Sequence, residues 1–360
     1  MRRHCHEHAL AVQTAIGRVG GHGAGFKLTR AVGRLRPMRP CPTVERVMLE
    51  ALDGRRVLFV VGKGGVGKST VATALAVVFA ESGKRVLLAQ MEPSRRLADF
   101  LGIEGAEGIV EALPNLCVLT VDGESALSEY LGLVLPVRRV QRMVVESKLY
   151  HHFVAAAPGL KELMTVGKIW YEEQLVAKGR PKWDVIVVDA PATGHVLQYL
   201  RMPSAAAEAF GPGLVRREAQ KVMELLCDPV RTAVCPVTTA EEMPVNETAE
   251  MYQQLRERLR MPLGVLFVNR VHAAPLAPTD IPDTPAGASP LVADVLRCAR
   301  EEAGWAAINR RYLDRLRTAV PMPTVLLPFV FAEEFGLDEV RGLMTNAARQ
   351  LDASLTEGRA

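Results

Sequence analysis

The sequence has no hydrophobic run long enough to cross a bilayer, and it has few aromatic residues. Its longest apolar stretch, Val71–Ala80, is interrupted by Thr73, whereas a membrane-spanning helix needs roughly 18 apolar residues. Aromatic residues make up 5% of the chain, while 49% of it is hydrophobic and 23% is charged. This composition is typical of a globular protein with a buried core, and we expect a cytoplasmic location.

Closely spaced cysteines are also missing. The six cysteines are Cys5, Cys41, Cys117, Cys227, Cys235 and Cys298. No two of them form a Cys-x-x-Cys pair, which excludes a zinc knuckle of that local type. Cys117 and Cys235 lie in apolar, strand-like segments, so we expect buried thiols at both positions.

An excess of charge is confined to the first 40 residues. They hold eight basic residues and one acidic residue, a charge of +7, so the rest of the chain carries −3. A mildly acidic body disfavours a nucleic-acid partner. We expect residues 1–50 to be a disordered tail or sequence upstream of the real start, with a nucleic-acid-binding arm and a transit-like peptide as alternatives.

The remaining sequence alternates short apolar segments with longer helical patterns, and it shows no internal repeat. The expected strands are Arg56–Val61, Arg85–Gln90, Leu116–Val121, Asp184–Asp189, Thr232–Val237, Leu263–Val268 and Thr324–Leu327. Segments rich in valine and leucine without polar alternation are typical of parallel strands buried on both faces. The alternation therefore predicts a doubly wound α/β fold with a mostly parallel sheet. We expect one domain over residues 51–355, with a helical insertion at about residues 125–178.

A glycine-rich loop follows the first expected strand and precedes a helix. Residues 62–69 fit the pattern Gly-x-x-x-x-Gly-Lys-Ser/Thr of a phosphate-binding loop. Glycines let backbone N–H groups turn toward phosphate oxygens, and the helix N-terminus adds partial positive charge. We expect Lys68 to reach the β- and γ-phosphates and Ser69 to supply a hydroxyl to Mg²⁺. The predicted ATP-binding residues of the loop are Gly62, Lys63, Gly64, Gly65, Val66, Gly67, Lys68, Ser69 and Thr70.

The strand ending at Asp189 supplies the expected second half of the site. A carboxylate at the end of a buried strand can hold Mg²⁺ through water. The sequence then continues Ala-Pro-Ala-Thr-Gly-His over residues 190–195. Further along, Thr238 with Glu241 and Thr239 with Glu242 have the spacing of helix capping boxes.

These motifs resemble those of the ArsA ATPase family, which belongs to the deviant Walker A group. The loop carries Lys63 directly after its first glycine, as in the signature Lys-Gly-Gly-x-Gly-Lys-Ser/Thr. Residues 189–195 resemble the family's D-T-A-P-T-G-H, and residues 92–99 resemble its D-P-A-H-N-L-S-D. The chain departs from the family at residues 190–192 and at Glu92, where the family has aspartate. The resemblance covers residues from about 55 to about 349.

The resemblance implies a homodimer in which Lys63 reaches the nucleotide of the partner subunit. It implies that Glu92 activates the attacking water, with a reach one methylene longer than that of aspartate. It further implies that Asn269, Pro328 and Phe329 lie against the adenine and ribose. For His195, a nucleotide-sensing role and the role of a capping or core histidine both remain open.

Three functional interpretations follow from this family. The first is Mg²⁺-dependent ATP hydrolysis by an ArsA-like ATPase whose dimer switches with nucleotide state. The second is a targeting factor for tail-anchored membrane proteins, and the third is a partition ATPase of the MinD and ParA type. A membrane protein or transporter is the expected partner. The apolar residues of the insertion fit core packing and client binding alike, with packing favoured.

Overall fold

The computed structural model describes residues 52, 54–93, 95–103, 108–134, 147, 159–272 and 278–344. The predictions for residues 1–50 and for most of residues 135–158 lie outside the described residues. The main sheet consists of β1 (Val57–Gly62), β2 (Val86–Gln90), β3 (Ile109–Leu113), β4 (Leu116–Thr120), β7 (Val185–Ala192), β8 (Thr232–Thr239), β9 (Leu266–Val271) and β10 (Thr324–Pro328).

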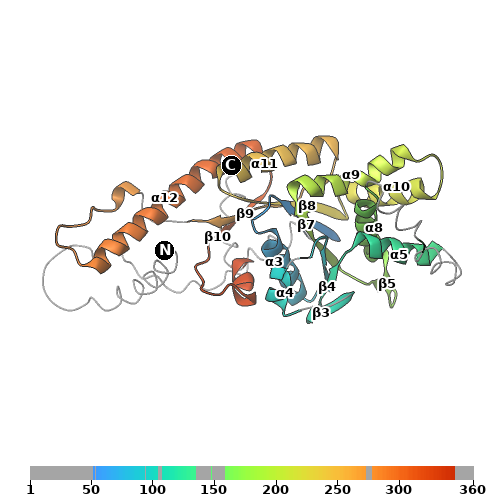
Figure 1. The fold of residues 1–360 in the computed structure, drawn as a ribbon, viewed down its shortest axis with the longest axis horizontal. Helices are drawn as coiled ribbons and strands as arrows, with labels where there is room; N and C mark the ends of the chain where they lie inside the picture. Colours follow the sequence, from blue (N-terminus) through green and yellow to red (C-terminus); the bar gives the residue numbers. More distant parts are fainter. Residues whose placement is uncertain are drawn as a thin grey trace.

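Helices cover this sheet and join its strands (Figure 1). They are α3 (Lys68–Glu81), α4 (Arg95–Leu101), α5 (Gly123–Val134), α8 (Leu160–Gln174), α9 (Thr193–Ala209), α10 (Leu214–Cys227), α11 (Glu242–Gln253) and α12 (Pro290–Ala319). A π-helical turn, η1 (Gln254–Arg258), follows α11, and a 3₁₀ turn, η2 (Pro278–Asp280), precedes α12.

The strand order confirms the predicted mostly parallel α/β sheet. The order is β10-β9-β8-β1-β7-β2-β4-β3, and every pairing is parallel except that of β3 with β4. Strand β1 lies in the middle, with β7 on one side and β8 on the other. Because parallel strands end at the same edge of a sheet, the residues that follow β1, β2, β7 and β8 gather at one edge.

Side chains of β1 alternate between two cores, one on each face of the sheet. Leu58 and Val60 belong to the core that includes the apolar side of α3. Val57, Phe59 and Val61 belong to the other core, which is built with residues of α8, α9 and α10. Since both faces are covered, nearly every position of the strand is apolar, as the sequence pattern indicated.

All seven predicted strands are present, but β7 and β8 run on to Ala192 and Thr239, beyond their predicted ends at Asp189 and Val237. Strand β9 starts at Leu266 rather than Leu263, because Leu263 makes only an isolated bridge to Val234. Strand β3 was not predicted. It lies at the edge of the sheet, where its side chains are partly exposed, so it lacks the continuous apolar run of the central strands.

The insertion is helical over α5 and α8 but ends in a short hairpin. Strands β5 (Val176–Ala177) and β6 (Arg180–Pro181) pair through a turn in which Lys178 and Gly179 both have positive φ. Such a two-residue turn suits the twist of a hairpin. Val166 and Ile169 of α8 are buried in the core, which supports core packing for these two residues.

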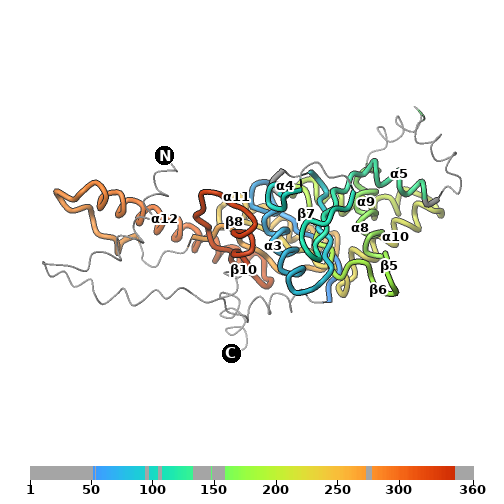
Figure 2. Tube along the Cα trace, turned by 90° about the horizontal axis from the view of Figure 1, so that it is seen from below, coloured from blue at the N-terminus to red at the C-terminus, as the bar shows by residue number. Residues whose placement is uncertain are grey.

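Helix α12 extends away from the sheet at the end opposite α5 and α10 (Figures 1 and 2). Its N-terminus is capped by Ser289, whose side chain accepts a hydrogen bond from the Val292 N–H. Among the described residues, no helix combines the length and the hydrophobicity needed to cross a membrane.

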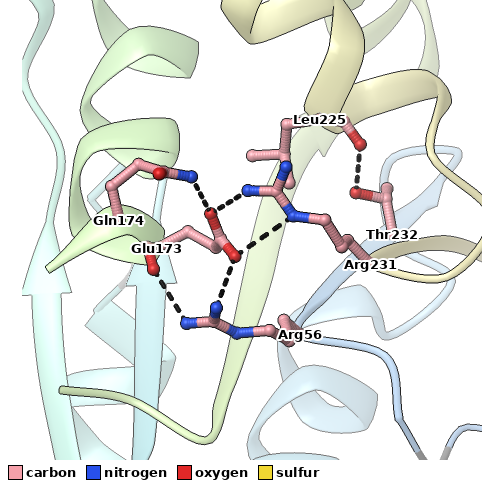
Figure 3. A network of polar contacts seen from close by, with 6 residues as sticks. All are labelled: Arg56, Glu173, Gln174, Leu225, Arg231 and Thr232. Carbon is pink, nitrogen blue, oxygen red and sulfur yellow. Dashed lines mark hydrogen bonds and ion pairs between the residues drawn. The ribbon is translucent and has the colours of Figure 1, made fainter. Parts of the chain in front are cut away.

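A buried carboxylate fixes the end of α8 to the edge of the sheet where β1 and β8 begin. The Glu173 side chain is fully buried and lies between Arg56, which precedes β1, and Arg231, which precedes β8 (Figure 3). Arg56 Nη1 is 2.9 Å from Glu173 Oε1, and Arg56 Nη2 also donates to the Glu173 carbonyl over 2.8 Å. Arg231 Nη2 donates to the second carboxylate oxygen. The helical layer is therefore anchored at the edge opposite the glycine loop.

We predict that Glu173→Gln lowers the free energy of unfolding by about 3–5 kcal/mol, because removing one member of a buried ionic group leaves the others uncompensated. Urea denaturation measures this loss. The control is Glu224→Gln on the exposed side of α10, which should change stability by less than about 0.5 kcal/mol. A loss below about 1 kcal/mol for Glu173→Gln would contradict the anchoring role.

Candidate functional site

At two glycines of the loop, the backbone lies so close to neighbouring chain segments that there is no room for a side chain. A Cβ on Gly62 would lie 2.2 Å from the Val237 carbonyl oxygen at the end of β8. Gly67 has a φ of 97°, and a Cβ there would lie 2.2 Å from Asn269 Nδ2. No other residue fits either position without displacing its neighbour. Helix α3 starts at Lys68, as predicted, so its N-terminus faces the loop.

Lys68 and Asp189 form the charged centre of the site. Burial lowers the pKa of the Lys68 ammonium, although the carboxylates of Asp189 and Glu92 act in the opposite direction. Lys68 Nζ donates to the Lys63 carbonyl oxygen over 3.2 Å. This half-buried cation is held inside its own loop, where it can turn toward an anion.

Asp189 is nearly inaccessible to solvent, with 6% of its surface exposed. The pKa of its carboxyl is raised to about 6. Burial is the main cause and the nearby Glu92 charge acts in the same direction, while a hydrogen bond from Ser69 and the charge of Lys68 lower the pKa. Asp189 and Ser69 are thus in contact, as the two predicted Mg²⁺-binding residues should be. Their oxygens are the hard ligands that Mg²⁺ prefers.

Three buried side-chain atoms in the described part of the chain lack a hydrogen-bond partner, and all three lie at this edge. They are Gln90 Nε2, Asp189 Oδ1 and Thr193 Oγ1. Gln90 and Asp189 are neighbours in register on β2 and β7, and Thr193 starts the helix after β7. Buried polar groups are normally satisfied. Their concentration here fits a site built for polar groups, namely phosphates and a hydrated Mg²⁺.

Lys63 makes a different contact from Lys68. Its ammonium lies 2.5 Å from Glu247 Oε1 on α11, and both side chains are about one-third exposed, at 31% and 34%. The sequence did not identify Glu247. The two predicted capping boxes beside it are wrong, because Thr238 and Thr239 belong to β8 and the residue before α11 is Glu241, which makes no side-chain cap.

Glu92 and His195 lie together at the rim of the site. His195 Nδ1 is 3.6 Å from Glu92 Oε1, and the two side chains are 73% and 53% exposed. His195 is therefore not a core histidine. It does not cap α9 either, since Ala192 precedes that helix and no side chain caps it. Because the charge of Glu92 affects the pKa of both Lys68 and Asp189, this carboxylate faces the same centre.

Asn269, on β9, is hydrogen-bonded to the glycine loop. It is buried, and its Nδ2 donates to the Val66 carbonyl oxygen over 2.9 Å, while its Oδ1 accepts from the Arg270 N–H. Sequence reasoning placed Asn269 against adenine and missed this contact with the loop, because it joins residues 203 positions apart.

Pro328 ends the neighbouring strand, β10, and Phe329 follows it. The Phe329 N–H donates to the Val271 carbonyl oxygen over 3.0 Å, two residues beyond Asn269. Its ring stacks on His272 with centroids 4.5 Å apart. The structure thus places Phe329 and Asn269 at the same edge of the sheet, and it adds a stacked histidine that the sequence did not reveal.

The predicted thiols differ in burial. Cys235 is completely buried, and burial raises the pKa of its thiol to about 11. Cys117 is only partly buried, so the prediction is wrong there. Its strand, β4, pairs with the partly exposed edge strand β3.

Comparisons with known proteins give consistent matches. Residues 55–212 match the family model described as anion-transporting ATPase. ATPase BagA of Mycobacterium tuberculosis is 33% identical over 237 residues, 64% of this chain and 69% of that protein. The arsenical pump-driving ATPase of Acidiphilium multivorum is 27% identical over 224 residues, 56% of this chain and 37% of that protein. ATPase GET3 of Debaryomyces hansenii is 25% identical over 313 residues, 76% of this chain and 84% of that protein.

We predict that Asp189→Asn stabilises the chain when nucleotide and Mg²⁺ are absent. Because the folded carboxyl has a pKa of about 6, above its unfolded value, burying its charge reduces stability at neutral pH. The reduction reaches about 3 kcal/mol at most and disappears below about pH 4. Urea denaturation should therefore show a gain for Asp189→Asn at about pH 7.5 that shrinks as the pH falls.

The control for this prediction is Asp99→Asn on the exposed side of α4, which should show no pH-dependent gain. A loss of stability in Asp189→Asn at about pH 7.5 and also at lower pH would contradict the destabilisation assigned to the buried charge.

Proposed function

This chain belongs to the ArsA family of anion-transporting ATPases and is an ATPase, and we propose that it hydrolyses ATP with Mg²⁺ and that the nucleotide state switches a homodimer. The observation that supports this most is the group of unpartnered buried atoms around Asp189, next to the desolvated ammonium of Lys68. A site of this kind is complete only with a phosphate and a hydrated cation in it.

Each loop residue has a distinct task in this proposal. Lys68 turns from the Lys63 carbonyl to the β- and γ-phosphates, while the backbone of residues 62–67 surrounds the phosphate oxygens. Ser69 and Asp189 would hold Mg²⁺, which would supply positive charge against the charge that develops on the phosphates. Asn269, Pro328 and Phe329 take the base side, at the far end of the same sheet edge.

Glu92 is the proposed base for the attacking water. Its carboxylate is half-exposed and close enough to influence both Lys68 and Asp189. A base at the rim can accept the proton and return it to solvent. His195 Nδ1, 3.6 Å from Glu92 Oε1, can hold the Glu92 side chain in place.

Lys63 is proposed to act on the nucleotide of the partner subunit. Lys63 and Lys68 are five residues apart in one loop, and two ammonium groups on the same phosphates would repel each other. Lys63 instead pairs with Glu247 on the next helix, α11, which begins where β8 ends beside the loop. A second copy that faces this edge would bring its phosphates to Lys63, in the manner of an arginine finger.

We predict that Lys63→Ala retains ATP binding but loses hydrolysis by about 10³-fold, the scale of an in-trans cation. Lys68→Ala should lose binding as well. Mixed dimers test whether Lys63 acts on the nucleotide of the other subunit. A Lys63→Ala subunit still binds ATP, and a Lys68→Ala partner still presents Lys63 to it.

The mixture should recover activity that neither variant shows alone, up to one active site per mixed dimer. Wild-type chains mixed with Lys68→Ala chains provide the control for dimer exchange. An inactive mixture in which mixed dimers are demonstrated by sedimentation would show that Lys63 does not act across the interface.

A further inference from the structure

Lys63 makes two contacts within its own subunit. Its backbone carbonyl accepts a hydrogen bond from Lys68 Nζ over 3.2 Å, and its side-chain ammonium lies 2.5 Å from Glu247 Oε1. The contact with Glu247 is the one that must break before the ammonium can reach a nucleotide outside its own subunit. The two contacts differ in what can break them.

ATP binding in the same subunit removes the first contact. Lys68 cannot donate to the Lys63 carbonyl and at the same time turn fully toward the phosphates. Its ammonium is half-buried in the loop, and a charged phosphate is a stronger hydrogen-bond acceptor for it than a neutral carbonyl. The Lys63 carbonyl therefore loses this donor when nucleotide occupies its own site.

The second contact remains until something competes for the ammonium. The Lys63–Glu247 pair is about one-third exposed on both sides, so it is screened by water and contributes little to stability. That is weak enough for a multiply charged phosphate to displace the carboxylate. By contrast, Glu173 is fully buried between two arginines, and a pair of that kind stays closed.

We propose that Glu247 is a positioning residue that holds Lys63 within its own subunit until the phosphates of a partner subunit replace the carboxylate. This rests on the proposed in-trans role of Lys63. It gives an order to the switch, in which nucleotide binds first and dimer closure then exchanges Glu247 for phosphate as the partner of Lys63. Unpartnered chains keep Lys63 away from their own nucleotide, which limits hydrolysis outside the dimer.

The experiment measures association of the full chain with Mg²⁺ and a non-hydrolysable ATP analogue, by sedimentation equilibrium. Glu247→Gln removes the competitor for Lys63, so the dimer dissociation constant should fall by about two- to five-fold. Glu250→Gln removes the same charge from an exposed position of the same helix and should leave association unchanged. In a Lys63→Ala background, Glu247→Gln should have no effect.

A second readout does not depend on dimers. In nucleotide-free chains, amine labelling of Lys63 should be faster in Glu247→Gln than in the wild type, while labelling of the exposed Lys178 stays the same. If Glu247→Gln does not fold, Glu247→Asp provides the test, since its shorter side chain also weakens the pair and should speed labelling of Lys63.

The outcomes separate this inference from the proposed function. An unchanged or weaker dimer in folded Glu247→Gln, or an unchanged labelling rate of Lys63, overturns the role of Glu247 even if Lys63→Ala is inactive. If Lys63→Ala hydrolyses ATP at the wild-type rate, the in-trans role itself fails, and the role of Glu247 fails with it.

Discussion

The charge of Asp189, held almost out of water at the end of β7, is the constraint on which the site depends. Burial raises the pKa of this carboxyl to about 6, and only Ser69 and Lys68 offset that effect. The fold keeps the group although its Oδ1 has no partner among the described residues. Such a group reduces the stability of the free chain and becomes favourable when a cation arrives, so stability and function oppose each other here.

The sheet places the glycine loop and Asp189 next to each other. β1 and β7 are neighbours in register, so the glycine loop and Asp189 emerge side by side at one edge. Glu173 fixes α8 to the opposite edge, where β1 and β8 begin. The helical layer that contains α8 is therefore tied to β1, which leads into the loop, and to its neighbour β8.

The ion pairs of Glu173 and of Lys63 lie at opposite edges of the sheet and differ in burial. The carboxylate of Glu173 is completely buried between arginines, and breaking it would leave uncompensated charges in the interior. The pair of Lys63 and Glu247 is open to solvent on both sides and is worth far less. Burial thus distinguishes the Glu173 anchor from the contact that we propose phosphate replaces.

Much of the fold was predictable because central parallel strands bury both faces and read as continuous apolar segments. The loop from Gly62 to Ser69 was predictable because phosphate binding restricts its residues locally. Strand β3 was missed because an edge strand need not be apolar throughout. Glu247 was missed for another reason: its contact with Lys63 spans 184 positions, and nothing in the local sequence marks a glutamate on a helix as the partner of a loop.

The central claim is that each nucleotide site is completed by a second copy of the chain. The most direct measurement is the hydrolysis rate per chain, at saturating ATP and Mg²⁺, across chain concentrations that span the transition from monomer to dimer. The claim predicts a rate per chain that rises with concentration and levels off as dimers form. A rate per chain that is already maximal where the protein sediments as a monomer, and stays constant as dimers appear, would contradict it.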